Sequence, residues 1–185
     1  GIYGNMSSYR VVIGGPPHSG KSTFTVALTE AIRDKKRGQV YNISFSKMTL
    51  DVEDNSLNAL LYDEPKRKND KCNDQNAKQR LEKFRSKTEE LVIADAPGKL
   101  TEHTETVIQP ADEMILLVND SKTSKVDEWK DTAESLGIDV TYTIISIESL
   151  ADGDPGWDDG DMNNGRGTYC SISRDDVEEK AISVY

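Results

Sequence analysis

The sequence predicts an α/β fold of three layers, in which a mainly parallel central sheet of five to six strands lies between two layers of helices. Two observations predict this arrangement. Short apolar runs alternate with amphipathic helical patterns along residues 9–147, and this alternation is typical of a parallel sheet covered on both faces. One of the runs, Met114 to Val118, is apolar without a break, as expected of a strand buried on both sides.

Each expected element rests on its own local pattern. Apolar residues spaced three and four apart predict helices, and glycines such as Gly38 and Gly137 are suited to end them. Ser124 to Asp127 has the form of a capping box that opens a helix. The expected strands are Tyr9 to Ile13, Gln39 to Phe45, Leu91 to Ala94, Met114 to Val118, Val140 to Ile147 and, shorter, Thr168 to Ile172. The expected helices cover residues 21–38, a short segment at 57–61, then 77–87, 104–108, 124–136 and 175–181.

Two long stretches lack such patterns. Residues 46–76 are polar and contain Lys66, Arg67, Lys68 and Lys71, and they are expected to form a long loop or lid. Residues 152–167 are rich in Asp and Gly. This second stretch fails the spacing of an EF-hand, because Trp157 and Asn163 stand where that loop needs glycine and glutamate. It is therefore expected to be a solvated acidic loop.

Length and composition limit the number of domains and the classes of function that the chain can have. The chain has 185 residues, which fits one domain over residues 6–185, and residues 1–5 are expected to be a remnant of cloning ahead of Met6. A net charge of −10 argues against a general nucleic-acid-binding surface. No apolar run is long enough to span a membrane, so a cytoplasmic protein is expected. Cys72 and Cys170 lack the spacing of a zinc site.

The most informative stretch is Gly15 to Ser22, which matches G-x-x-x-x-G-K-[ST] at every fixed position. This is the Walker A phosphate-binding loop. It follows an apolar strand and precedes an amphipathic helix, the context that the motif requires. The two glycines allow a tight turn whose backbone N–H groups surround an anion. Lys21 is expected to reach the β- and γ-phosphates, Ser22 to bind Mg²⁺ and Thr23 to contact the α-phosphate.

A second signal follows the third strand, where Asp95-Ala96-Pro97-Gly98 has the form D-x-x-G. Asp95 is expected to be the Walker B acid that holds Mg²⁺, with Gly98 contacting the γ-phosphate through its N–H. Asp51 or Glu53 could add a base or a second metal ligand. The expected catalytic residues are Lys21 and Asp95. The expected nucleotide contacts are Gly15, Pro16, Pro17, His18, Ser19, Gly20, Lys21, Ser22, Thr23 and Gly98, and the expected metal ligands are Ser22, Asp95 and Asp51.

These motifs, together with QPADEMILLV at residues 109–118, resemble the kinase-GTPase division of P-loop NTPases. Within it the similarity is to ATPases related to MinD and dethiobiotin synthetase, over residues 10–147. The extra signature lysine of the MinD type is absent. IGGPPHSGKS at 13–22 and VDEWKDTAESLGIDV at 126–140 are also similar to the P-loop ATPase domain of CRISPR-associated ring-nuclease fusion proteins. That resemblance implies a role in CRISPR-associated defence.

The base and the reaction remain open at this stage. Asn119-Asp120-Ser121-Lys122 has the residues of the guanine-reading N-K-x-D motif in the wrong order, which favours ATP over GTP. An ATPase or regulatory nucleotide-binding module is the favoured function. A small-molecule or nucleotide kinase with a phosphoryl acceptor is the main alternative, because both need the same phosphate chemistry. A GTPase, or a scaffold in which ATP fixes a homodimer or a partner protein, is a further alternative.

Overall fold

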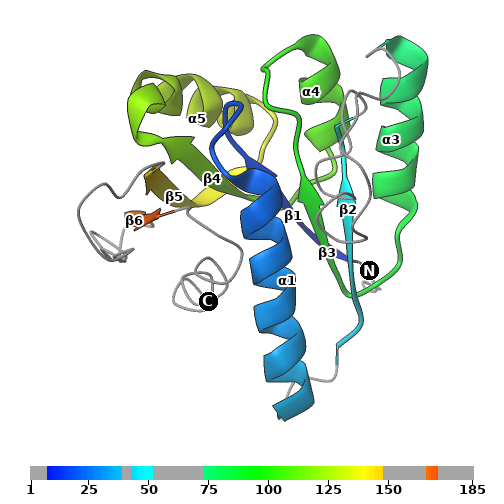
Figure 1. Ribbon diagram of the computed structural model, residues 1–185. Coiled ribbons are helices and arrows are strands. Elements are labelled where there is room, and N and C mark those ends of the chain that lie inside the picture. Colours follow the sequence, from blue (N-terminus) through cyan, green and yellow to red (C-terminus); the bar gives the residue numbers. More distant parts are fainter. Residues whose placement is uncertain (1–7, 39–42, 52–72, 148–165, 171–185) are drawn as a thin grey trace, which may run out of the picture.

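The protein forms a six-stranded sheet in the order β2-β3-β1-β4-β5-β6, and every strand pairing in it is parallel. Figure 1 shows it as a computed structural model, which describes residues 8–38, 43–51, 73–147 and 166–170. The strands are β1 (Tyr9–Gly14), β2 (Phe45–Thr49), β3 (Leu91–Asp95), β4 (Glu113–Asn119), β5 (Asp139–Ile147) and β6 (Arg166–Cys170). The helices are α1 (Lys21–Gly38), α3 (Asp74–Ser86), α4 (Glu102–Ile108), the 3-10 helix η1 (Asp120–Lys125) and α5 (Val126–Ser135).

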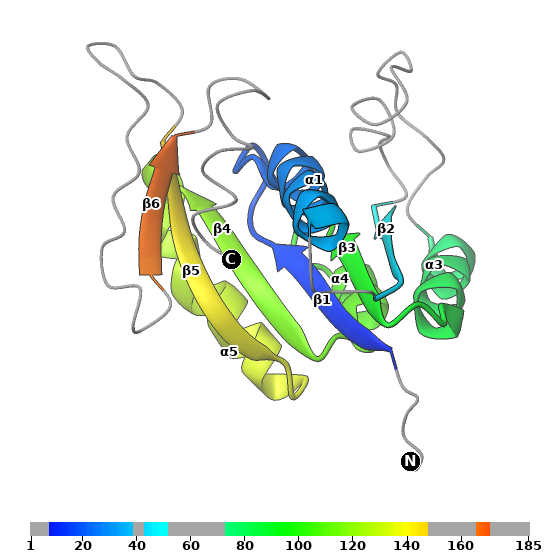
Figure 2. The same ribbon diagram turned by 90° about the horizontal axis from the view of Figure 1, so that it is seen from below.

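Two apolar cores hold the three layers together. Alternate residues of each strand face opposite sides of the sheet, and the two buried clusters follow that alternation. On one side Phe24 and Leu28 of α1 pack against one set of strand residues, which includes Val11 and Ile13. On the other side the packing residues of α3, α4 and α5 are Ala77, Phe84, Val107, Ile108, Trp129 and Ala133. Figure 2 shows α1 on one face of the sheet and α4 and α5 on the other. The predicted three-layer fold is confirmed.

The second strand was placed too early by the sequence pattern. The prediction was Gln39 to Phe45, whereas β2 begins at Phe45 and runs to Thr49. Residues 39–42 lie outside the described residues. The apolar pattern did not locate this strand because β2 is an edge strand that pairs only with β3. It contains the polar residues Ser46 and Lys47, and it buries only Met48 and Thr49 at its end.

Other boundaries differ in smaller ways. The bounds predicted for the loop at residues 46–76 are wrong at both ends, because β2 runs to Thr49 and α3 begins at Asp74; residues 52–72 lie outside the described residues. Asn73 caps α3 by accepting a hydrogen bond from the Asn76 N–H at 2.9 Å. Of the loop predicted for 152–167, Arg166 and Gly167 belong to β6, and the rest lies outside the described residues. The helices predicted at 57–61 and 175–181 lie outside the described residues, as do the four basic residues of the predicted lid.

The capping box predicted at Ser124 to Asp127 is wrong. A 3-10 helix covers Asp120–Lys125, with a kink at Lys122 where φ is −126° and ψ is 26°. α5 follows directly and has no side-chain cap. The 3-10 turn runs directly into α5, and the Val126 N–H at the start of the helix donates to the Thr123 carbonyl in place of a Ser124 cap. The kink falls on Lys122, whose side chain contacts the Pro17 carbonyl.

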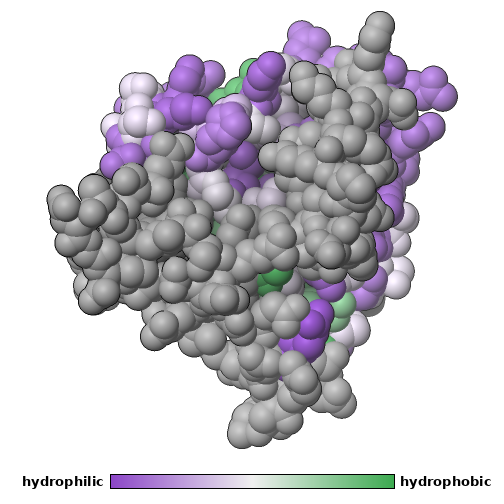
Figure 3. All heavy atoms as spheres, viewed as in Figure 1, coloured by the Kyte–Doolittle hydropathy of each residue, from purple (hydrophilic) through white to green (hydrophobic). Residues whose placement is uncertain are grey.

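The described surface is mainly polar. In Figure 3 the coloured atoms are mostly hydrophilic, with only small hydrophobic areas, and among the described residues Tyr9 is the one large hydrophobic side chain that is exposed. None of the helices in these residues combines the length and the apolarity needed to cross a membrane.

Arg10 ties the start of β1 to the end of α3. Its guanidinium donates from Nε to the Phe84 carbonyl at 2.9 Å, and from Nη2 to the carbonyls of Arg85 at 2.6 Å and Lys87 at 2.7 Å. It also lies over the Phe84 ring, 5.9 Å from the centroid. The last carbonyls of a helix have no partner within the helix, so this one cation satisfies several of them.

We expect Arg10→Ala to lower the free energy of unfolding by roughly 1 to 3 kcal/mol, because charge-assisted hydrogen bonds to helix-terminal carbonyls are lost. Arg10→Lys should recover only part of the loss, since an ammonium cannot reproduce the planar set of donors. Urea unfolding of the three proteins measures this. Equal stability of Arg10→Lys and wild type would show that charge alone matters here.

Candidate functional site

The loop predicted to bind phosphate joins the carboxyl end of β1 to the first turn of α1, and its backbone has the shape that an anion cradle needs. Gly15 and Gly20 adopt φ values of +141° and +83°, and His18 adopts +62°. A Cβ at Gly15 would lie 1.7 Å from the Leu117 carbonyl oxygen of β4. Only glycine fits there, since the chain turns directly against the neighbouring strand.

Lys21 lies inside this turn. Its side chain is buried, and its ammonium donates to the Pro16 carbonyl at 3.0 Å. The lysine therefore closes back over the loop that precedes it. Because an ammonium offers three donors, a phosphate oxygen could be bound while the contact to the Pro16 carbonyl is kept.

Ser22 and Asp95 meet although 73 positions separate them in sequence. The Ser22 hydroxyl donates to Asp95 Oδ2 at 2.6 Å, and Asp95 is 4% exposed. The contact follows from the sheet register, which pairs Ile13 of β1 with Asp95 at the end of β3. Thus two of the residues predicted to hold a metal ion, Ser22 and Asp95, lie beside each other, and Lys21 precedes Ser22 in the chain.

Gly98 lies against the loop as well. A Cβ at Gly98 would come within 3.0 Å of three atoms of Pro17. The segment that follows β3 is therefore packed directly onto the loop, as expected if it senses what the loop holds. Thr101 then caps α4 by accepting from the Thr104 N–H at 3.3 Å.

The other predicted residues lie in different parts of the structure. Pro16, Ser19 and Gly20 belong to the loop itself, where Ser19 is buried and His18 is exposed. Thr23 lies in the first turn of α1. Asp51 lies at the same edge of the sheet, because the Leu50 N–H donates to the Asp95 carbonyl at 2.8 Å, but within the described residues no three His, Cys, Asp or Glu side chains form a metal-binding group. Glu53 lies outside the described residues.

Sequence reasoning did not find the contribution of the segment after β4. The Asn119 N–H donates to Ser19 Oγ at 3.2 Å, and the Lys122 ammonium donates to the Pro17 carbonyl at 2.9 Å. Asn119 Oδ1 accepts from the Ser121 N–H at 2.9 Å and from its hydroxyl at 2.6 Å. The sequence analysis interpreted these residues only as a guanine-reading N-K-x-D motif in the wrong order. Their position at the carboxyl end of a parallel strand could have indicated a contribution to the site, because ligands bind at that edge of such sheets.

The residues fit a nucleoside triphosphate with Mg²⁺. The loop leads into the positive amino end of α1, carries the buried Lys21, and lies beside a hydroxyl–carboxylate pair suited to a hard cation. Asn119 adds a buried amide donor, Nδ2, that has no hydrogen-bond partner within the described structure. Oδ1 of this amide faces the backbone N–H of Ser121, which can only donate.

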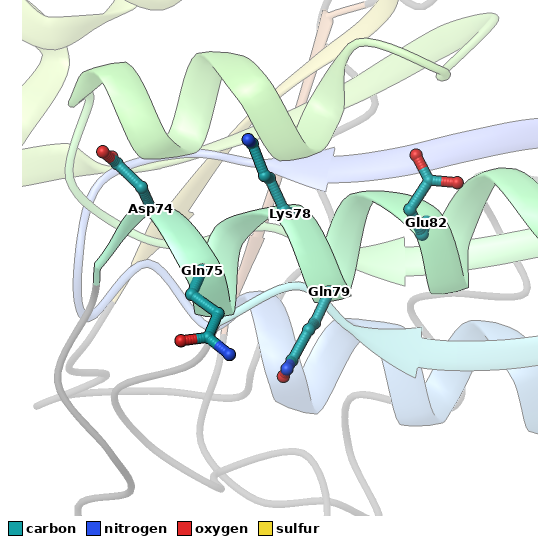
Figure 4. Close-up of a pocket in the computed structure, with 5 residues that line it drawn as sticks. All are labelled: Asp74, Gln75, Lys78, Gln79 and Glu82. Atoms are coloured by element: carbon teal, nitrogen blue, oxygen red, sulfur yellow. The ribbon is translucent and has the colours of Figure 1, made fainter.

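A separate pocket lies along α3, and its lining residues are far in sequence from the loop Gly15 to Ser22. It has a volume of about 640 Å³ and is lined by Asp74, Gln75, Lys78, Gln79 and Glu82. Figure 4 shows that all five side chains come from this one helix. Asp74 bonds His103 of α4 at 2.8 Å. The lining is that of a solvated helix face, and it contains none of the residues of the phosphate-binding motif.

Comparison with known proteins places the fold. No protein-family model matches the sequence, and no curated protein matches it. Among solved structures, the chain is similar to MinD complexed with Mg-ADP from Pyrococcus horikoshii, with 13% identity, a TM-score of 0.58, and coverage of 76% of this chain and 70% of that one. It is also similar to a putative plasmid partition protein from Borrelia burgdorferi bound to AMPPNP, with 11% identity, a TM-score of 0.54, and coverage of 96% and 98%.

A third similar structure is the signal recognition particle 54 kDa protein from Aeropyrum pernix in complex with GDP, with 14% identity, a TM-score of 0.52, and coverage of 95% of this chain and 46% of that one. Identities this low establish a shared fold. The chain therefore has the P-loop NTPase fold, as the sequence predicted. These neighbours do not support the resemblance to the CRISPR-associated domain.

We expect Gly15→Ala to destabilise the protein by more than about 3 kcal/mol, because the added methyl group would have to displace β4 at Leu117. Gly137→Ala is the matched control. Gly137 also has a positive φ, +73°, but a Cβ there meets nothing within 4 Å, so only the backbone conformation is penalised, by about 1 kcal/mol. Thermal or urea unfolding compares the two. Equal losses would mean that the approach to Leu117 is not a constraint.

Proposed function

We propose that the protein binds ATP with Mg²⁺ at the loop from Gly15 to Ser22 and acts as an ATPase or an ATP-dependent regulatory module. The observation that carries the proposal is the contact of Ser22 with Asp95 at 2.6 Å beside the buried Lys21. Several nucleotide-binding proteins share the fold, and MinD with Mg-ADP is one of them. The proteins that share the fold support nucleotide binding. The arrangement of Lys21, Ser22 and Asp95 supports the loop as the place where the nucleotide binds.

Each residue would have a distinct task. The N–H groups from His18 to Ser22 and the start of α1 would bind the phosphate oxygens, and Lys21 would bind the β- and γ-phosphates. Ser22 and Asp95 would hold the metal ion, which supplies charge neutralisation between these phosphates. Gly98, packed on Pro17, would offer its N–H at the γ-phosphate. Electrostatic stabilisation of this kind needs no covalent intermediate.

ATP is proposed over GTP because the guanine-reading motif is absent from the sequence. The fold by itself supports either base, since a structure with GDP and structures with adenine nucleotides are all similar to this chain. A kinase remains the second candidate, as the phosphate chemistry is common to both. No described residue favours a phosphoryl acceptor. A homodimer and a protein partner belong to the alternative in which the protein is an ATP-dependent scaffold, and a role in CRISPR-associated defence rests on the sequence resemblance alone.

We expect MgATP at a hundredfold excess over its Kd to raise the melting temperature by roughly 5 to 10 °C, because a ligand that binds only the folded state stabilises it by mass action. Lys21→Ala should lose most of this shift, whereas Lys83→Ala, which removes an exposed lysine of α3, should keep it. MgGTP is measured in parallel. A full shift in Lys21→Ala would place the nucleotide elsewhere, and a larger shift with GTP would overturn the choice of base.

We expect Asp95→Asn to reduce ATP turnover by roughly a hundredfold while changing nucleotide affinity little, because a metal-holding carboxylate acts mainly on charge that develops in the transition state. Phosphate release and nucleotide affinity are measured at saturating Mg²⁺. The control is Asp139→Asn, an exposed aspartate at the opposite end of the sheet. Wild-type turnover in Asp95→Asn would reduce the D-x-x-G segment to a simple turn.

A further inference from the structure

We propose that Lys122 is a positioning residue of the phosphate site, which fixes the peptide unit between Pro17 and His18 so that the His18 N–H faces the bound phosphates. This inference rests on the proposed nucleotide binding. It goes beyond it by assigning a role to a residue outside both phosphate motifs. Lys122 acts through the loop and is not placed in contact with the nucleotide.

The first step concerns the supply of donors in the loop. Proline has no backbone N–H, so Pro16 and Pro17 contribute none to the cradle. After Gly15, the next N–H available to an anion is that of His18. Loops of this kind bind phosphate mainly through backbone N–H groups, so the orientation of this one peptide unit matters more here than in a loop without prolines.

The second step concerns the direction of that peptide unit. In a trans peptide the carbonyl and the following N–H point in opposite directions. The Lys122 ammonium binds the Pro17 carbonyl at 2.9 Å, and it therefore holds the His18 N–H on the other side. Lys21 binds the preceding carbonyl, that of Pro16, at 3.0 Å. Both carbonyls of the proline pair are thus occupied by cations, which leaves the N–H groups of the loop for the anion.

The third step concerns strain. His18 adopts a φ of +62°, a conformation that is strained for a residue with a side chain. Rotation of the Pro17–His18 peptide would relieve this strain and turn the N–H away. The hydrogen bond from the Lys122 ammonium to the Pro17 carbonyl is charge-assisted and therefore stronger than one between neutral groups, so it opposes the rotation.

The fourth step explains how Lys122 reaches the loop. Asn119, at the end of β4, is fixed to the loop through its N–H bond to Ser19 Oγ at 3.2 Å. The side chain of Asn119 then holds Ser121 through two hydrogen bonds. The kink of η1 falls on Lys122 itself. The segment is therefore anchored directly ahead of the lysine contact, and the lysine is half-buried there.

The test compares Lys122→Met with Lys125→Met. Lys125 lies in the same 3-10 helix, but its side chain is 53% exposed and pairs with Glu128 at 3.6 Å, so its removal takes away the same charge without touching the loop. For Lys122→Met we expect a roughly tenfold loss of MgATP affinity and of kcat, the scale of losing one well-directed hydrogen bond to the phosphates. We expect less than a twofold change for Lys125→Met. Lys122→Arg, which can still donate to a carbonyl, should retain most of the function.

A double-mutant cycle with His18→Gly separates positioning from mere stability. Glycine removes the strain at this position, so the effect of Lys122→Met on affinity should become clearly smaller in the His18→Gly background. The melting temperature without nucleotide monitors folding in every variant. An unchanged effect of Lys122→Met in that background, or equal effects of Lys122→Met and Lys125→Met, would overturn the proposal while leaving nucleotide binding intact. No binding by the wild type would instead overturn the proposed function and this inference with it.

Discussion

The close approach of Gly15 to β4 is the constraint on which the site depends. The chain leaves β1 and must turn at once, with no space for a side chain between Gly15 and the Leu117 carbonyl. This contact aligns the loop with the ends of β1, β3 and β4, which are adjacent in the sheet. As a result, residues from two other parts of the sequence converge on one short turn: Asp95 and Gly98 from the end of β3 and the segment after it, and Asn119 and Lys122 from the end of β4 and the segment after it.

The site concentrates charge in an otherwise acidic protein. The net charge of the chain is −10, yet the loop is contacted by two ammonium groups, those of Lys21 and Lys122. Together with the amino end of α1, they form a local positive field. The one buried carboxylate described at this place, Asp95, is held by Ser22, where a divalent cation would complete the charge balance. Anion binding is therefore supported locally, against the overall charge.

The success of sequence reasoning varied with burial and with local chemistry. β1, β3 and β4 were placed within a residue or two, because strands buried on both faces are apolar throughout. β2 was misplaced because an edge strand contains Ser46 and Lys47 and so lacks that signal. The helix start at α5 was misread because Ser124 and Asp127 satisfy a local pattern, while the preceding residues form a 3-10 turn that the pattern does not include.

The sequence by itself determined the fold class, the turn from Gly15 to Ser22, and Lys21, Ser22 and Asp95 as candidate site residues. Those features depend on short motifs and periodic burial, whose physical requirements are local. Only the tertiary structure decided that Ser22 contacts Asp95, that Gly98 packs on Pro17, and that Asn119 and Lys122 hold Ser19 and Pro17. The hydrogen bonds among these contacts join residues 73 to 105 positions apart, and they arise from strand order and register, which place distant strand ends side by side.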